Sequence, residues 1–133
     1  METPLPKTRQ RSKPIGEKIK LKEKGKTSVL GGVPQSLPAL VKAMRIQEKA
    51  SGIGFDWENG NQVWDKVEEE IKEFKTEIHA ETGNPKRANE EFGDVLFSLI
   101  NYARFQGINP EEAPERTNKK FIKRFQYLES ASK

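Results

Sequence analysis

The chain is 133 residues long, with 24 Lys and Arg, 20 Asp and Glu, one His and no Cys. This length allows one domain with a core, and the composition excludes disulfides, thiolate metal sites and multi-histidine zinc sites, so any metal would bind to oxygen. Because the chain has no run of roughly 20 apolar residues and its N-terminus lacks the apolar block of a signal peptide, we expect a cytoplasmic protein without membrane contact.

The positive charge is concentrated at the N-terminus. Residues 1–26 hold nine Lys and Arg against three Glu, a net charge of +6, and since the whole chain carries +4, the remainder carries −2. Proline and glycine also recur up to residue 34. We therefore predict a flexible, basic, linker-like tail over residues 1–32 and one domain over residues 33–130. The alternative, contact of the tail with nucleic acid or another anionic surface, is disfavoured because the domain itself is mildly acidic.

The first predicted helix follows this tail. Ser36 is its expected N-cap, Pro38 lies in its first turn, and Gly52 and Gly54 end it. Its apolar face consists of Leu37, Leu40, Val41, Ala43 and Met44. A short loop with two aromatic residues and a turn at residues 59–61 then lead to the next helix.

The second helix is predicted from Gln62 to about Glu81, because apolar residues recur there at spacings of three and four. These residues are Trp64, Val67, Ile71, Phe74 and Ile78. On a helix of 3.6 residues per turn, Glu70 lies beside this apolar face, with Glu73 a little further round and Glu69 nearer the far side.

The third helix is predicted from Pro85 to Gln106, with Asn84 as its cap, and it is apolar round most of its circumference. Such a helix is typical of the middle of a bundle. Its exceptions form one narrow polar stripe at positions i, i+3, i+7 and i+10, namely Glu91, Asp94, Ser98 and Asn101. Polar groups on a buried helix need partners, so the stripe indicates a binding site.

The fourth helix begins after Gly107, at residues 109–112, and has both an apolar and a basic set of side chains. Phe121, Phe125 and Leu128 form the apolar face, and the basic residues are Lys119, Lys120, Lys123 and Arg124. With the three preceding helices this predicts an all-α fold.

Carboxylates on the second and third helices point to a hard cation. Like charges at these spacings repel by roughly 0.2–0.5 kcal/mol a pair, so folding alone does not favour them. If the two helices pack antiparallel, Glu70 and Glu73 would face Glu91 and Asp94 across one cleft, and such oxygen ligands suit Mg²⁺. The alternative is that residues 68–70 are ordinary surface glutamates, but acids interrupting an apolar helix are seldom buried without compensation.

A cation beside basic side chains is the arrangement that phosphate chemistry requires. Lys120 and Arg124 share one face of the fourth helix and could bind an oligophosphate together, and Lys86 and Arg87 are second candidates. The alternative for all four is simple solvation. The chain has no glycine-rich P-loop, so phosphates would be bound by the metal and side chains.

Six blocks in order resemble the MazG nucleoside triphosphate pyrophosphohydrolases over about residues 24–129. These blocks are residues 36–43 (SLPALVKA), 54–57 (GFDW), the EExxE and ExxD pair at 69–73 and 91–94, 92–97 (FGDVLF), 101–104 (NYAR) and 118–121 (NKKF). The resemblance implies a four-helix MazG-like bundle completed by a homodimer. It also implies Mg²⁺, which Mn²⁺ could replace, and hydrolysis of nucleoside triphosphates to monophosphate and pyrophosphate as housecleaning of the nucleotide pool.

The resemblance also assigns roles to individual residues. The metal ligands are Glu70, Glu73, Glu91 and Asp94. Glu69 is the water-activating base or a supporting carboxylate. Phosphate contacts are Lys120, Arg124 and Arg87. Asn101 would form a hydrogen bond with the nucleotide. Phe55 and Trp57 would line a base pocket or serve only as packing.

Family members generally contain two tandem copies of the domain joined by a charged linker, and this chain resembles that linker followed by the second copy. Two other functions stay open. One is a non-catalytic helical dimerisation or cation-binding module. The other is an all-α pyrophosphatase specific for one pyrimidine deoxynucleotide.

Overall fold

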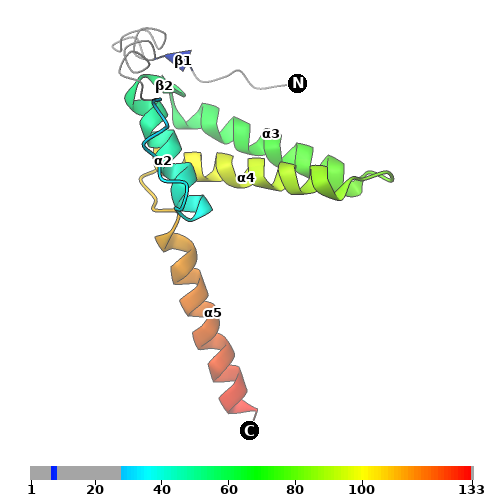
Figure 1. The fold of residues 1–133 in the computed structure, drawn as a ribbon. Coiled ribbons are helices and arrows are strands. Elements are labelled where there is room, and N and C mark those ends of the chain that lie inside the picture. Colours follow the sequence, from blue (N-terminus) through cyan, green and yellow to red (C-terminus); the bar gives the residue numbers. More distant parts are fainter. Residues whose placement is uncertain (1–6, 9–27, 133) are drawn as a thin grey trace.

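The computed structural model describes residues 7–8 and 28–132, and four helices make up most of that part (Figure 1). They are α2 (Ala39–Gly52), α3 (Gly60–His79), α4 (Pro85–Phe105) and α5 (Glu112–Ala131). Two-residue strands, β1 (Lys7–Thr8) and β2 (Phe55–Asp56), pair antiparallel. The predicted all-α fold is confirmed. The predicted flexible tail, residues 1–32, falls mainly outside the described residues.

Asparagine side chains cap the N-termini of the two central helices, α3 and α4. Oδ1 of Asn59 accepts a hydrogen bond from the backbone N–H of Gln62, at 3.0 Å, and Oδ1 of Asn84 accepts one from Lys86, at 2.9 Å. Each bond satisfies one of the donors that a helix N-terminus leaves unpaired. The cap and the Pro85 start of α4 are therefore as predicted, and α3 begins two residues before the predicted Gln62.

The expected cap of α2 was wrong. The residue before the first helical position is Pro38, which makes no side-chain capping bond, and Ser36 lies in a turn in which the N–H of Leu37 donates to the carbonyl of Pro34. The helix instead starts with the bond from Lys42 N–H to the Pro38 carbonyl, at 2.8 Å. Pro38 sets the start because proline favours an extended residue before it, which keeps Leu37 out of the helix.

The helices α3 and α4 form a long antiparallel pair that carries the core (Figure 1). Val63 and Val67 of α3 are fully buried, and Val95 and Ile100 of α4 are buried with them. Two ring contacts join the pair along its length, Trp64 with Tyr102 at 5.0 Å between centroids and Phe74 with Phe92 at 5.4 Å. The helix α2 packs across the C-terminal half of α4, next to β2.

Within the single chain, α4 is not enclosed on most sides as a helix in the middle of a bundle would be. Val95, Ser98, Ile100 and Asn101 are buried, but Phe92, Phe97 and Leu99 are 47%, 44% and 39% exposed. The reason is that α5 does not cover them. After Gly107, at φ 68°, the chain turns and α5 extends away from the other three helices (Figure 1). Its apolar face, Phe121, Phe125 and Leu128, is exposed.

None of the helices in the described part of the chain is long and apolar enough to cross a membrane.

Candidate functional site

Three of the four predicted metal ligands meet where α3 faces α4. Glu70, Glu91 and Asp94, called here the carboxylate triad, each place one carboxylate oxygen so that the three oxygens lie within 4.8 Å of one another. Glu70 is buried, Glu91 is partly buried and Asp94 is exposed. The antiparallel packing of α3 and α4, which was the condition for a shared cleft, brings both clusters of acids to one place.

Two oxygens of this triad are buried without a partner. Oε2 of Glu70 and Oε2 of Glu91 accept no hydrogen bond from any described residue. A buried carboxylate oxygen without a partner is costly, and the cost is greater when other carboxylates lie beside it. A hard divalent cation binds oxygen ligands of this kind and would compensate both atoms, so the residues present fit such an ion.

The fourth predicted ligand, Glu73, lies next to the triad but outside the group of three oxygens. Burial, followed by the negative charges of Glu70, Glu91 and Glu69, raises its pKa. Burial and the charge of Glu70 likewise raise the pKa of Asp94. Both carboxyls are thus held among like charges, which is the electrostatic condition that a bound cation relieves.

A lysine that sequence reasoning missed balances one side of the triad. Nζ of Lys66 lies 2.9 Å from Oε1 of Glu70 and 3.5 Å from Oε2 of Glu69. Burial lowers the pKa of Lys66, but the bonds and charges of Glu70 and Glu69 outweigh it, so the net shift is upward. The signal was present in the sequence, because Lys66 precedes Glu70 by four residues on the same helix face.

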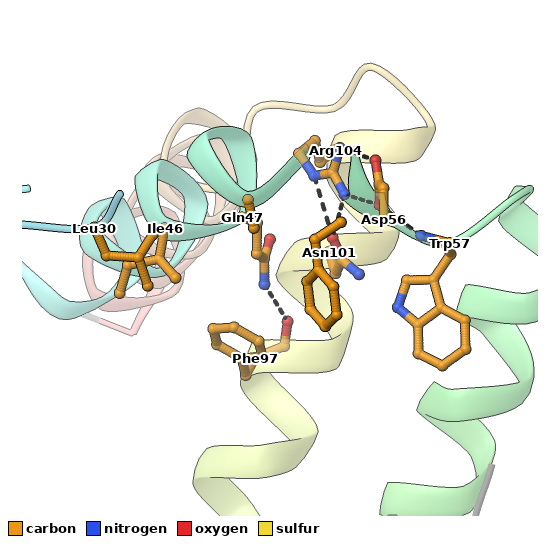
Figure 2. A pocket seen from close by; sticks show the side chains of 10 residues that line it. Leu30, Ile46, Gln47, Asp56, Trp57, Phe97, Asn101 and Arg104 are labelled. Carbon is orange, nitrogen blue, oxygen red and sulfur yellow. Dashed lines mark hydrogen bonds and ion pairs between the residues drawn. The ribbon is translucent and has the colours of Figure 1, made fainter. Parts of the chain in front are cut away.

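A charge network supports Asn101 at the end of the polar stripe (Figure 2). Arg104 donates to Asp56 through two nitrogens, at 2.7 and 3.0 Å, and to Oδ1 of Asn101 at 2.8 and 3.1 Å. Burial alone would raise the pKa of Asp56. Hydrogen bonds from Arg104, Ser51 and the Trp57 backbone, together with the charge of Arg104, reverse this effect and lower it. Sequence reasoning assigned no role to Arg104 or Asp56.

The hydroxyl of Ser98, the remaining member of the polar stripe, has a hydrogen-bond partner within its own helix. Oγ of Ser98 donates to the carbonyl of Val95 in the same helix, at 2.8 Å.

Two cavities share part of their lining, and one of them reaches the triad. The first, about 280 Å³, reaches Glu70, Asp94 and Lys66, and we call it the acid-lined cavity. The second, about 230 Å³, reaches Gln47 and Arg104, and we call it the amide-lined cavity (Figure 2). The two cavities have four lining residues in common, namely Phe55, Trp57, Phe97 and Asn101. The predicted substrate residues Phe55, Trp57 and Asn101 therefore lie together, between the two cavities.

The predicted phosphate ligands are divided. Arg87 lies by the acids, since its Nε is 3.8 Å from Oε2 of Glu77 and it lines a third cavity together with Glu73 and Glu91. Lys120 and Arg124 lie on α5, which extends away from α3 and α4 (Figure 1). The single chain therefore does not bring these two cations to the triad.

Comparison with known proteins identifies relatives. A model of the MazG nucleotide pyrophosphohydrolase domain matches residues 60–128. The chain is 45% identical over 115 residues to the nucleoside triphosphate pyrophosphohydrolase/pyrophosphatase MazG of Thermotoga maritima, and 40% identical over 116 residues to the nucleoside triphosphate pyrophosphohydrolase of Escherichia coli K12. It is also 49% identical over 119 residues to the uncharacterized protein YabN of Bacillus subtilis.

These alignments cover most of this chain but only part of each relative. They include 85%, 85% and 88% of the chain, against 43%, 44% and 24% of the three proteins. The chain thus spans less than half the length of the relatives it matches.

Proposed function

The chain belongs to the MazG nucleotide pyrophosphohydrolase family, and we propose that it hydrolyses nucleoside triphosphates to the monophosphate and pyrophosphate with the help of a divalent cation. The observation that carries the proposal is the carboxylate triad with its two unpartnered buried oxygens. The names of the relatives from T. maritima and E. coli support the same reaction. A cytoplasmic location, with access to the nucleotide pool, is part of this proposal.

Glu70, Glu91 and Asp94 would hold the cation, with Glu73 as a fourth ligand. We take this cation to be Mg²⁺, with Mn²⁺ as a substitute, because the donor set is entirely carboxylate oxygen. When bound, it would neutralise phosphate oxygens and lower the cost of charge on the departing pyrophosphate.

The side chains around the triad would position the reactants. Lys66 holds Glu70 and Glu69 in place through its ammonium group, and it lines the acid-lined cavity where an anionic phosphate would enter. Glu69, whose Oε2 lies 3.5 Å from Nζ of Lys66, is our candidate for the base that accepts a proton from the attacking water. Arg87 is a candidate phosphate contact on the other side of the triad.

Lys120 and Arg124 enter this proposal through a second copy of the chain. They flank the exposed apolar face of α5, and α4 exposes Phe92, Phe97 and Leu99. Exposed apolar surfaces of this kind are typical of subunit interfaces. We propose a homodimer in which α5 packs against the helices of a partner, which would carry its two cations towards a triad.

The test is to incubate the purified chain and Mg²⁺ with a panel of ribo- and deoxyribonucleoside triphosphates and to separate pyrophosphate from orthophosphate. We expect pyrophosphate in amounts equal to the monophosphate, and a loss of at least about 100-fold in Asp94→Asn, as expected when transition-state electrostatics are removed. Glu68→Gln, an exposed acid on α3, is the control and should retain activity.

Each of the other outcomes would contradict the proposal. Orthophosphate as the first product, or full activity in Asp94→Asn, would exclude the reaction or the site. No turnover of any nucleotide would favour the non-catalytic dimerisation or cation-binding module. Turnover of a single pyrimidine deoxynucleotide would favour the specialised pyrophosphatase over an enzyme that acts broadly on the nucleotide pool.

A further inference from the structure

The amide-lined cavity contains a buried acceptor with no partner. Gln47, on α2, is 5% exposed, and its Nε2 donates to the carbonyl oxygen of Phe97 on α4 at 3.0 Å. Because only the nitrogen of the amide can donate to a carbonyl, this bond determines which way the amide faces. Oε1 of Gln47 is therefore left as an acceptor, and none of the described residues donates to it.

A donor lines the same cavity as this acceptor. Asn101 is one turn beyond Phe97 on α4, and its Oδ1 accepts two bonds from Arg104, which leaves the Nδ2 amide group as a donor (Figure 2). Asn101 lines both cavities, and Gln47 lines the one further from the carboxylate triad. The cavity thus offers one acceptor and one donor between aromatic walls, Phe55, Trp57 and Phe97.

We propose that Gln47 recognises the nucleobase of the substrate, with its Oε1 accepting an N–H from the edge of the base. A nucleobase is a planar ring with donors and acceptors on one edge, so it suits aromatic walls with an amide at the far end. The lining that the two cavities share supports this occupant, because a nucleotide with its phosphates in the acid-lined cavity would place its base against the shared residues, of which Phe97 also accepts the bond from Gln47. The identity of the ligand rests on the proposed function.

Asp56 and Arg104 act here as positioning residues. The two bonds from Arg104 to Asn101 hold the orientation of that amide, and the paired contacts of Arg104 with Asp56 anchor the guanidinium. The pair Gln47 and Asn101 would thus be preorganised before the base enters, which reduces the entropy cost of binding.

The experiment measures the binding of unphosphorylated nucleosides in matched pairs. Adenosine and purine riboside differ only by the exocyclic amine, as do cytidine and 2-pyrimidinone riboside. Each is titrated into the full chain, and the side-chain amide signals of glutamine are followed by NMR. In the unaltered protein we expect the amine-bearing member of at least one pair to bind about tenfold more tightly, the value of one hydrogen bond to a buried acceptor.

Gln47→Met keeps the length of the side chain and removes the acceptor, so the tenfold preference should disappear. The Phe97 carbonyl still accepts a backbone N–H hydrogen bond within α4, so the substitution leaves no new unpaired group there. Gln106→Met, at an exposed glutamine after α4, is the control and should keep the preference. The thermal unfolding temperature of both variants shows that they are folded, and the signals that disappear in Gln47→Met identify the Gln47 amide.

Two results would overturn the inference. One is a preference that persists in Gln47→Met, and the other is a Gln47 amide that does not shift with any nucleoside. Either result can occur while pyrophosphate is still released from triphosphates, in which case the proposed function stands without this base site. Conversely, Gln47-dependent nucleoside binding without any triphosphate cleavage would leave the inference standing and remove the proposed function.

Discussion

At the scale of single residues, the buried oxygens of the carboxylate triad make a direct prediction about metal binding. Mg²⁺ at about 100 times its dissociation constant should stabilise the protein by about 2.7 kcal/mol, because it binds the folded and not the unfolded chain. Glu70→Gln should lose most of this gain, since Glu70 is the buried member of the triad. The measurement is thermal unfolding with Mg²⁺ and with a chelator.

The matched control for this experiment is Glu68→Gln, on the same helix but exposed. It should keep the full Mg²⁺-dependent gain. An equal gain in Glu70→Gln would mean that the cation binds elsewhere, and the assignment of the triad would have to be abandoned.

A second residue-scale prediction concerns the ion pair between Asp56 and Arg104. Asp56 is 2% exposed and Arg104 is mostly buried, so Asp56→Asn leaves a buried guanidinium without its counter-charge. We expect a loss of about 3 kcal/mol in the free energy of unfolding at pH 7. Chemical denaturation measures it, and Asp65→Asn, an exposed acid on α3, should cost far less.

The pH dependence of that loss has a definite sign. The pKa of Asp56 is lowered in the folded protein, so its contribution to stability is fully present above the ordinary value of 3.8 and is lost as the pH falls through the folded pKa. The difference between the unaltered protein and Asp56→Asn should therefore be constant near neutral pH and shrink below pH 3.8. A difference that grew in acid would contradict this account.

At the scale of helices, local sequence chemistry sets most boundaries. Asparagine side chains cap α3 and α4 because their oxygens satisfy backbone donors that the helix cannot. The predicted second helix nevertheless ended two residues late. Ala80 adopts an extended conformation, with ψ 135°, and its N–H donates to the carbonyl of Glu77, so the last helical residue is His79.

The cap of α4 supplies the prediction at this scale. Asn84→Ala removes the oxygen that accepts from Lys86 N–H, and it should lower the free energy of unfolding by about 1 kcal/mol. Asn89→Ala, in the exposed interior of the same helix, is the control and should be neutral or slightly stabilising, because alanine is the better helix former. Equal effects of the two substitutions in denaturant titrations would show that the cap does not stabilise α4.

At the scale of the whole molecule, the position of α5 is the main feature. Phe121 and Leu128 are 67% and 63% exposed, on a helix that carries two of the predicted phosphate ligands. In proteins most of the stability of a helix comes from packing of its apolar side, and α5 has little of its own chain to pack against, so we expect a partner to cover it. The proposed homodimer supplies that partner.

The dimer can be tested by placing a charge on this face. Phe125→Asp should weaken association by at least about 3 kcal/mol, roughly 100-fold in the dissociation constant, because it removes an aromatic ring and buries a carboxylate. Sedimentation equilibrium measures it. Gln126→Asp adds the same charge to the opposite side of α5 and should leave the dimer intact. A monomer at all concentrations of the unaltered protein would refute the proposal.

The sequence by itself determined the four helices, one of the two predicted N-caps, and the meeting of Glu70, Glu91 and Asp94. These features follow from helix periodicity and from a turn of a few residues, so they are local. The pairing of Lys66 with Glu70 was also local and was overlooked.

Only the tertiary structure decided what surrounds the acids. Gln47 meets Phe97 and Asp56 meets Arg104 across 50 and 48 residues of chain, through the way α2 and β2 pack on α4. No periodicity encodes such a crossing, since it depends on how side chains of separate helices fit together. For the same reason the sequence could place Lys120 and Arg124 on one face of a helix. It could not predict whether that helix lies beside the carboxylates or away from them.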